Sequence, residues 1–361
     1  MDAVFARLAR EEVPFLLESY SALDRYFRVR EPGDVFIRTD ASLVTLAKLF
    51  ESLSFPGYAN ADALLDAEGK LYFFRCVDEM DVSSGLAFTA LDLLYNIERD
   101  TFQDPHGIYP DLRQEELVRT PVPSSMMGAI MQAARLVSRY HYTSEIEPGA
   151  SVDGLPAPPI EDQRELLRAV LTSRYPDKGL DLLSRTGFVA SCWPELAAMA
   201  TVAQSKEHHP EGDVWTHTLA ALRSRKHHGL TLGAGLLLHD IGKPVSKGSK
   251  ERPFENHAEI GAGLATKFLR RMGFSDSLVE QVSYLVRFHM MPAALPKLPL
   301  YRTERLMSSP LFPELLELYR ADLVSTFRRP SGYYEACRIY QRFLRGRANP
   351  FWVPQRSRPL S

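Results

Sequence analysis

Histidine and aspartate residues in an order typical of metal sites are concentrated in the second half of this sequence. Eight of the ten histidines lie between His208 and His289, and His239 is followed directly by Asp240. Imidazole and carboxylate groups bind divalent transition metals, and ligands contributed by several helices are spread over many residues. We therefore expect the second half of the chain to fold as helices around a metal centre.

Four of the expected ligands lie in or at the ends of apolar helical segments. Three leucines precede His239 and Asp240 in TLGAGLLLHDIGKP, so the pair is expected at the end of a buried helix, where unpartnered polar groups are costly. His217 and Asp322 lie in two other segments with apolar neighbours. A hydrogen-bonded core histidine or a surface aspartate would explain either residue alone, but it does not explain the whole set.

His257 and His289 decide between one metal ion and two. His257 is expected to begin a helix and His289 to end one, so both can complete a cluster that faces other helices. Four ligands would bind one ion, whereas six ligands would let Asp240 bridge two ions, as in many phosphoryl-transfer sites. Histidine-rich ligation favours manganese, iron, cobalt, nickel or zinc, and magnesium remains an alternative.

Further residues are candidates for catalysis and substrate binding. Asp240 is expected to be catalytic as well as a ligand, and Lys243, which follows it closely, is expected to meet an anionic substrate group. His209 and Arg287 are additional candidates for substrate binding. His208, His227 and His228 are less constrained, and the last two are expected at the surface.

Composition is that of an ordinary globular protein. The 361 residues are 45% hydrophobic, and the formal net charge is -2, so no bulk charge demands a nucleic-acid partner. We find neither a signal-like N-terminus nor an apolar run of the roughly 18 residues that crossing a membrane requires, and we expect a cytoplasmic protein. Cys76, Cys192 and Cys337 are far apart, which indicates neither a disulfide framework nor a thiolate zinc site.

The pattern of apolar and β-branched residues along the chain predicts an α+β protein that is mostly helical. Segments 34–40 and 70–78 are rich in β-branched and aromatic residues and flank a helical stretch at 42–53, which indicates a small α/β unit. A helix is expected at 126–140 and a linker at 148–159. Apolar residues at three- and four-residue spacing then predict helices within 161–173, 213–228, 231–240, 257–273, 277–290 and 312–327.

These motifs resemble a known family. The runs HHPEGDVWTHTLAAL, LLLHDIGKP, ENHAEIGAGLA, LVRFHMMP and LYRADLVST are similar to the HD domain of bacterial tRNA nucleotidyltransferases, which include the CCA-adding enzymes and poly(A) polymerases. GLDLLSRTGFVASCWPEL resembles the helical segment that precedes this domain. The resemblance implies that four residues bind a first metal and two serve a second; they are His217, His239, Asp240 and Asp322, then His257 and His289.

The first part of the chain resembles the polymerase head of the same family in its scaffold. GDVFIRTDASLVTLAKLF and DPHGIYPDL match the family's catalytic strand region and a later turn. Nucleotidyl transfer needs two carboxylates on one strand face, but Asp34 is followed two residues later by Phe36. The small residues that cradle a triphosphate are replaced by Tyr20 to Asp24, and the neck motif that reads the base is replaced near Ser125.

We therefore expect a degenerate head at residues 1–112, a helical neck at 113–205, an HD domain at 206–330 and a basic tail at 331–361. The expected function is metal-dependent hydrolysis of nucleotides, 2′,3′-cyclic phosphates or RNA ends, with RNA, including tRNA, or a nucleotide as partner. One alternative is an active tRNA nucleotidyltransferase, with the second carboxylate supplied elsewhere, by Asp40, Asp62, Asp78 or Asp81. The other is an RNA-binding protein whose metal is structural.

The tail has a local positive excess that has two interpretations. Eight arginines follow Asp322 against a single acidic residue, Glu335. Such a segment can contact a phosphate backbone, or it can form a solvated helix face.

Overall fold

A computed structural model describes residues 2–29, 33–55, 61–67, 69–80, 84–121, 124–143, 146, 149–203, 212–246, 254–326 and 330–348. The chain divides into two compact units, residues 1–150 and residues 151–361. The division falls at Ala150, inside the segment for which the sequence predicts a linker.

Unit 1 contains a mixed sheet, whose seven described strands are ordered β3-β4-β5-β2-β1-β6-β7. Only β2 and β5 pair in parallel, and the other neighbours are antiparallel. The strands are β1 (Phe15–Glu18), β2 (Val35–Thr39), β3 (Leu53–Ser54), β4 (Ala63–Ala67), β5 (Lys70–Cys76), β6 (Leu94–Asn96) and β7 (Thr101–Gln103).

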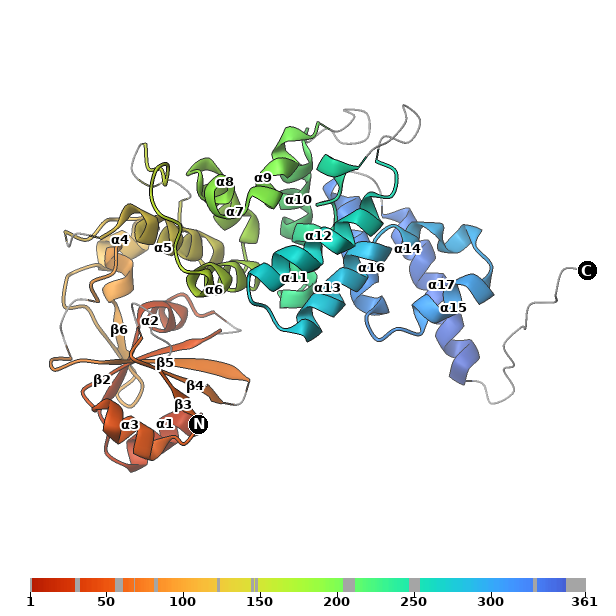
Figure 1. Ribbon diagram of the computed structural model, residues 1–361. Coiled ribbons are helices and arrows are strands. Elements are labelled where there is room, and N and C mark those ends of the chain that lie inside the picture. The colour runs from red at the N-terminus through yellow and green to blue at the C-terminus, as the bar shows by residue number, and fades with distance from the viewer. Residues whose placement is uncertain are drawn as a thin grey trace, which may run out of the picture. The chain divides into compact units, whose positions relative to one another are not determined.

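Helices cover this sheet because alternate strand residues are apolar. In unit 1 they are α1 (Ala3–Arg10), α2 (Ser19–Tyr26), α3 (Leu43–Leu49), α4 (Tyr109–Gln114), α5 (Met126–Arg139) and the 3-10 helix η1 (Thr89–Asp92). Helices α1 and α3 lie on one side of the sheet (Figure 1), where Phe5 contacts Tyr72 and Phe50 contacts Phe74. Tyr72 and Phe74 are two residues apart on β5, so both point to this face.

A buried ion pair ties α2 to α5. Asp24 of α2 accepts hydrogen bonds from the Arg139 guanidinium, with Nε at 2.6 Å, and from the Tyr140 hydroxyl at 2.8 Å. Asp24 is 5% exposed, so its negative charge needs these partners. The segment for which a helix at 126–140 is predicted is thereby fixed against the sheet layer.

Unit 2 consists of helices, apart from one isolated antiparallel bridge between Ala203 and Asp213, in its described residues. Its α-helices are α6 (Ile160–Leu171), α7 (Pro176–Arg185), α8 (Phe188–Cys192), α9 (Pro194–Ala197), α10 (Val214–Arg223), α11 (Leu230–Leu238), α12 (His257–Arg271), α13 (Asp276–Phe288), α14 (Met291–Ala294), α15 (Leu300–Met307), α16 (Phe312–Ser325) and α17 (Ser331–Ala348). The 3-10 helices are η2 (Ala198–Thr201), η3 (Lys243–Val245) and η4 (Leu295–Lys297).

Helix α11 is the centre of this unit. It packs against α6, α10, α13 and α16, and its residues from Leu232 to Leu238 are all buried. A helix that is apolar on every side is stable only when other helices surround it. The residues that follow Leu238 therefore enter the interior of the helical unit rather than its surface.

The predicted fold class is confirmed, since the chain is mostly helical with a small mixed sheet. The predicted strands correspond to β2 and β5, and the sequence did not reveal the other five. Three of these, β3, β6 and β7, have two or three residues, too few for period-two alternation to be recognised. Among the described residues, no helix has the length and apolarity needed to cross a membrane.

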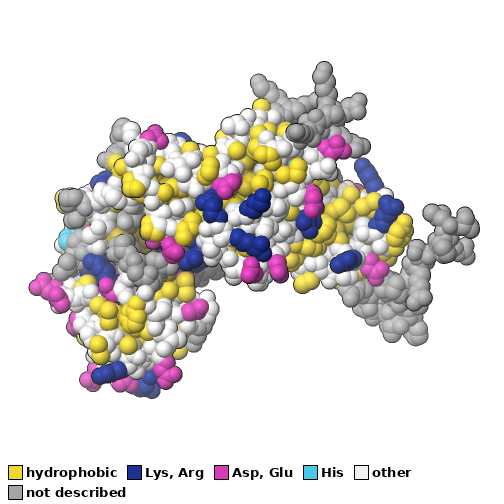
Figure 2. Space-filling model, viewed as in Figure 1, with side chains coloured by type: hydrophobic (Ala, Val, Ile, Leu, Met, Phe, Trp, Pro, Cys, Tyr) yellow, Lys and Arg dark blue, Asp and Glu magenta, His cyan; other side chains and the backbone are white. Residues whose placement is uncertain are grey.

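On the face drawn in Figure 2, basic and acidic side chains are interspersed over the helical unit. This distribution is consistent with the formal net charge of -2. The basic side chains do not form a single broad surface on this face.

Gly242 lets the end of α11 approach the start of α12. A Cβ atom built at Gly242 would lie 2.1 Å from the carbonyl oxygen of His257 and 2.7 Å from the amide nitrogen of Gly261. Both neighbours are backbone atoms of α12, so neither can move without displacing the helix. In contrast, a Cβ atom at Gly263 of the same helix would meet nothing within 4 Å.

We predict that Gly242→Ala lowers the free energy of unfolding by at least about 2 kcal/mol, because the added methyl group overlaps backbone atoms. Urea unfolding of the full chain, followed by circular dichroism, measures this change.

Gly263→Ala is the matched control. It should raise the free energy of unfolding by about 1 kcal/mol, because alanine favours an exposed helical position over glycine. Equal stability of the Gly242→Ala variant and the unmodified chain would show that the two helices do not make this close approach.

Candidate metal centre

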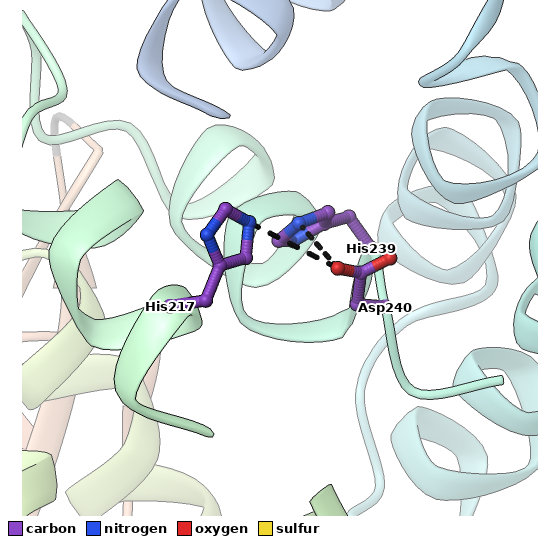
Figure 3. A group of neighbouring side chains, drawn as sticks. All are labelled: His217, His239 and Asp240. Atoms are coloured by element: carbon purple, nitrogen blue, oxygen red, sulfur yellow. Dashed lines mark ion pairs between the residues drawn. The ribbon is translucent and has the colours of Figure 1, made fainter. Parts of the chain in front are cut away.

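Three buried side chains from two helical segments meet at the first candidate metal position. His217 comes from α10, and His239 and Asp240 directly follow α11. In Figure 3 both imidazole rings face the Asp240 carboxylate, with Nε2 of His217 at 3.9 Å and Nε2 of His239 at 3.2 Å from Oδ2. Asp322 of α16 lies beside this group, since its Oδ1 lies 3.0 Å from Nε2 of His217 and 3.8 Å from Nε2 of His239.

A second group shares Asp240 with the first. Nε2 of His257 and Nε2 of His289 lie 3.5 Å and 3.9 Å from Oδ1 of Asp240. The two Nε2 atoms are 3.2 Å apart. One carboxylate oxygen of Asp240 therefore faces each group of histidines.

The spacing of these atoms fits metal ligation. Two atoms that each lie about 2.1 Å from one ion are at most about 4.2 Å apart. Every separation given above for the first and second groups falls within this limit. The sequence thus predicted six residues that the fold brings together.

One buried atom of the cluster has no hydrogen-bond partner among the described residues. Nε2 of His239 is buried and forms no hydrogen bond with the described residues, and the side chain is 1% exposed. A buried polar atom without a partner costs free energy, and a divalent ion in the first group would satisfy it. The donor set of imidazole and carboxylate groups therefore fits a divalent metal ion.

Three of the histidines are oriented by backbone carbonyl groups. Nδ1 of His239, His257 and His289 lies 2.8, 2.7 and 2.7 Å from the carbonyl oxygen three residues earlier in the chain. A carbonyl oxygen only accepts, so each Nδ1 carries a proton and donates it. Nε2, the atom that faces the cluster, is thereby left as the metal-binding nitrogen.

Burial and neighbouring charges set the protonation of the ligands. Burial by itself would raise the pKa of Asp240, but the positive charges of His239, in its protonated form, and of Lys243 outweigh burial and hold this pKa well below its usual range. Burial lowers the pKa of His289 to about 4 and also lowers the pKa of His257. At neutral pH the centre therefore contains an anionic carboxylate and two neutral imidazoles, which are the forms that bind metals.

Asp322 behaves like Asp240. Burial would raise its pKa, but His217, whose Nε2 lies 3.0 Å away, and His239 lower the pKa below its ordinary value when they are protonated. Its side chain is 22% exposed, more than those of His217, His239 and Asp240. The first group is therefore open to solvent on the Asp322 side.

The residues predicted to bind substrate lie in different environments, and not all of them are near the cluster. Lys243 is buried, and its Nζ lies 2.7 Å from Oδ2 of Asp240 and 5.3 Å from the centre of the Phe254 ring. Arg287 is half exposed and pairs with Glu259 at 3.0 Å. His209 lies outside the described residues, as does His208. Contact of these side chains with a substrate stays a prediction.

Other predicted features lie away from the cluster. His227 pairs with Glu314 at 3.2 Å and is 48% exposed, as expected for a surface residue. Helix α17 contains Arg338, Arg342 and Arg345, and all three are exposed. Arg328, Arg329, Arg356 and Arg358 lie outside the described residues.

In unit 1, charged residues gather on the sheet face opposite α1 and α3. Arg38 of β2 is 1% exposed and donates from Nε to Glu18 of β1 at 2.7 Å, and Arg75 of β5 lies 3.7 Å from the same carboxylate. Phe36 shares this face and stacks on Phe73. The strands pair Leu17 with Ile37, so the antiparallel register places Glu18 across from Phe36.

The sequence analysis did not identify two residues near these sites, Glu18 and Ser325. Glu18 stands beside the strand where a second carboxylate was sought, but its position depends on pairing between strands. Ser325 follows Asp322 by three residues on α16 and contacts His217, which is far away in the sequence. The three-residue spacing is the one local signal that Asp322 and Ser325 share a helix face.

Comparison with known proteins identifies the helical part. Residues 214–326 match the HD domain family. The chain is 33% identical over 187 residues to the CC-adding tRNA nucleotidyltransferase of Thermus thermophilus, covering 49% of this chain and 42% of that protein. It is 31% identical over 242 residues to the A-adding tRNA nucleotidyltransferase of Deinococcus radiodurans, covering 61% and 54%. The chain thus spans about half the length of these relatives.

Solved structures share the fold over nearly the whole chain. The CCA-adding enzyme of Bacillus stearothermophilus, determined with CTP, has a TM-score of 0.54 at 17% identity and covers 99% of this chain and 90% of that chain. A tRNA nucleotidyltransferase complexed with a primer tRNA and an ATP analogue has a TM-score of 0.53 at 12% identity, covering 96% and 100%. The fold, including the sheet unit, is therefore that of these enzymes.

One prediction from the sequence is wrong. A phosphohydrolase with a catalytically inactive head is contradicted by the two relatives above, which are named as CC-adding and A-adding tRNA nucleotidyltransferases and not as hydrolases. The spacing of Asp34 and Phe36 concerns only β2 and the residue that precedes it, whereas the fold adds Glu18 from the neighbouring strand to the face that carries Phe36. Spacing within β2 therefore does not establish that carboxylates are lost from the head.

The matched HD domain, the sequence relatives and the shared fold lead to one conclusion. Residues 214–326 form an HD domain, and the sequence relatives and the shared fold support membership of the tRNA nucleotidyltransferase family that carries such a domain in the C-terminal region.

Proposed function

We propose that this chain adds nucleotides to the 3′ end of tRNA. The observation that carries the proposal is the similarity to nucleotide-adding enzymes, found both in sequence and in a fold that extends over 99% of the chain. The alignment with the A-adding relative covers 61% of this chain. This share is larger than the share of the chain that unit 2, residues 151–361, makes up, so the alignment extends into unit 1. The similarity in sequence is therefore not confined to the HD domain.

The charged sheet face of unit 1 supports this proposal. Nucleotide addition joins an RNA 3′ hydroxyl group to the α-phosphorus of a nucleoside triphosphate and releases pyrophosphate. Carboxylates that hold divalent ions and cations that contact phosphates both favour this chemistry. Glu18 supplies a carboxylate on this face, Asp34 immediately precedes β2, and Arg38 and Arg75 supply positive charge.

We predict that the chain extends a tRNA that lacks 3′-terminal nucleotides when it is supplied with ATP or CTP and a divalent ion. Glu18→Gln should lower the rate of extension by at least about 100-fold, because it removes a charge needed for metal binding. Electrophoresis of radiolabelled tRNA at single-nucleotide resolution measures the extension.

Asp66→Asn, at an exposed carboxylate of β4, is the control and should leave the rate unchanged. Circular dichroism of the Glu18→Gln variant checks that the loss is not one of folding, because Glu18 is paired with buried Arg38. Failure of the unmodified chain to extend any such tRNA with any nucleoside triphosphate would refute the proposed function.

We also propose that the cluster in the HD domain binds two divalent ions. His217, His239, Asp240 and Asp322 would hold the first ion, and Asp240, His257 and His289 would hold the second. The proposal is supported by the distances between ligand atoms and by the unsatisfied Nε2 of His239. With four imidazoles and two carboxylates, manganese, iron, cobalt, nickel and zinc suit the centre better than magnesium.

Metal content distinguishes the ion held by the first group from the ion held by the second. The unmodified chain should bind two equivalents of metal, His289→Ala one equivalent, and Asp240→Ala none, because Asp240 belongs to both groups. Dialysis against manganese or zinc followed by elemental analysis measures these numbers.

His227→Ala is the control, since this histidine lies outside the cluster and pairs with Glu314. It should keep both equivalents. An unmodified chain that retains no metal after dialysis would contradict the proposed centre without affecting the prediction for nucleotide addition.

A further inference from the structure

His217 is oriented differently from the other three histidines of the cluster. Nδ1 of His239, His257 and His289 donates to a backbone carbonyl three residues earlier, so the local backbone fixes each of those rings. Nδ1 of His217 instead lies 3.2 Å from the hydroxyl oxygen of Ser325, a side chain on another helix.

The second hydrogen bond of Ser325 determines which atom carries the proton. Oγ of Ser325 lies 2.5 Å from the carbonyl oxygen of Asp322. That oxygen only accepts, so the single hydroxyl proton of Ser325 points to it. Oγ then acts as an acceptor toward His217, which requires a proton on Nδ1.

A proton on Nδ1 leaves Nε2 of His217 as the nitrogen that faces the metal. Nε2 lies 3.0 Å from Asp322 and 3.9 Å from Asp240, on the side of the ring away from Ser325. The opposite tautomer would place a proton on Nε2, where it would donate to the Asp322 carboxylate and occupy the metal-binding position. Ser325 therefore opposes the tautomer that Asp322 alone would favour.

We propose that Ser325 is a positioning residue that keeps Nε2 of His217 available to a divalent ion. The inference rests on the proposed metal centre. Ser325 is 5% exposed and His217 is fully buried, so the hydrogen bond between them is shielded from competing water. Ser325 also links His217 to Asp322, because its hydroxyl contacts the imidazole of one ligand and the carbonyl group of the other.

The test compares Ser325→Ala with Ser325→Thr in the full-length chain. Partners that orient a metal ligand change metal affinity by about 10- to 100-fold when they are removed. Zinc affinity of the first group, measured by competition with a chromophoric chelator, should fall by this factor in Ser325→Ala and be restored in Ser325→Thr.

Nuclear magnetic resonance of the metal-free protein with ¹⁵N-labelled histidine provides a second measurement. The unmodified chain should show a proton bonded to Nδ1 of His217. In Ser325→Ala this proton should move to Nε2, where the Asp322 carboxylate accepts it, and Ser325→Thr should restore the proton on Nδ1. A purely structural role for Ser325 would not change the site of protonation.

Thr326→Val is the matched control. Thr326 neighbours Ser325, and its hydroxyl group donates to the carbonyl oxygen of Leu323 at 2.8 Å, which repeats the bond of Ser325 to Asp322 three residues away. The variant should retain zinc affinity and the Nδ1 proton.

The two measurements also distinguish failure of this inference from failure of the metal centre. If the unmodified chain binds no zinc, the proposed metal centre is refuted. The position of the His217 proton would still support or overturn the role of Ser325 in orienting the ring. Unchanged zinc affinity together with an unchanged Nδ1 proton in Ser325→Ala would overturn the inference.

Discussion

The helical unit depends on the burial of one negative charge. The Asp240 side chain is 3% exposed and lies within 4 Å of four histidines and of Lys243. A carboxylate at this depth costs several kcal/mol unless cations, hydrogen bonds or metal ions surround it. The arrangement of α10, α11, α12, α13 and α16 therefore serves to bring compensating groups to one point.

The packing of α11 makes this burial unavoidable. Its apolar residues must be covered by other helices, and Asp240 follows it by only two residues. Gly242 then allows α12 to approach so closely that His257 reaches Asp240 from the other side. The same close packing that stabilises the helical unit thus assembles its ligands.

The sheet unit also buries a carboxylate, but a cation rather than histidines compensates its charge. Glu18 and Arg38 form a buried pair on one face, with Arg75 nearby, whereas the opposite face is covered by aromatic contacts with α1 and α3. Both faces of the sheet are therefore buried, one by aromatic contacts and the other by a charge pair beside apolar side chains such as Phe73. The Glu18 carboxylate is stabilised at this depth because Arg38 pairs with it.

The sequence by itself determined the helical character of the second unit and the set of six clustered residues. Apolar periodicity is a local property, and each ligand is recognisable by its chemistry beside buried helix positions. Tertiary structure alone decided the pairing of Glu18 with Arg38 and the contact of Ser325 with His217, because these depend on strand register and on the packing of α10 against α16. Residues 108 positions apart share no local pattern, and only the folded chain brings their atoms within hydrogen-bonding distance.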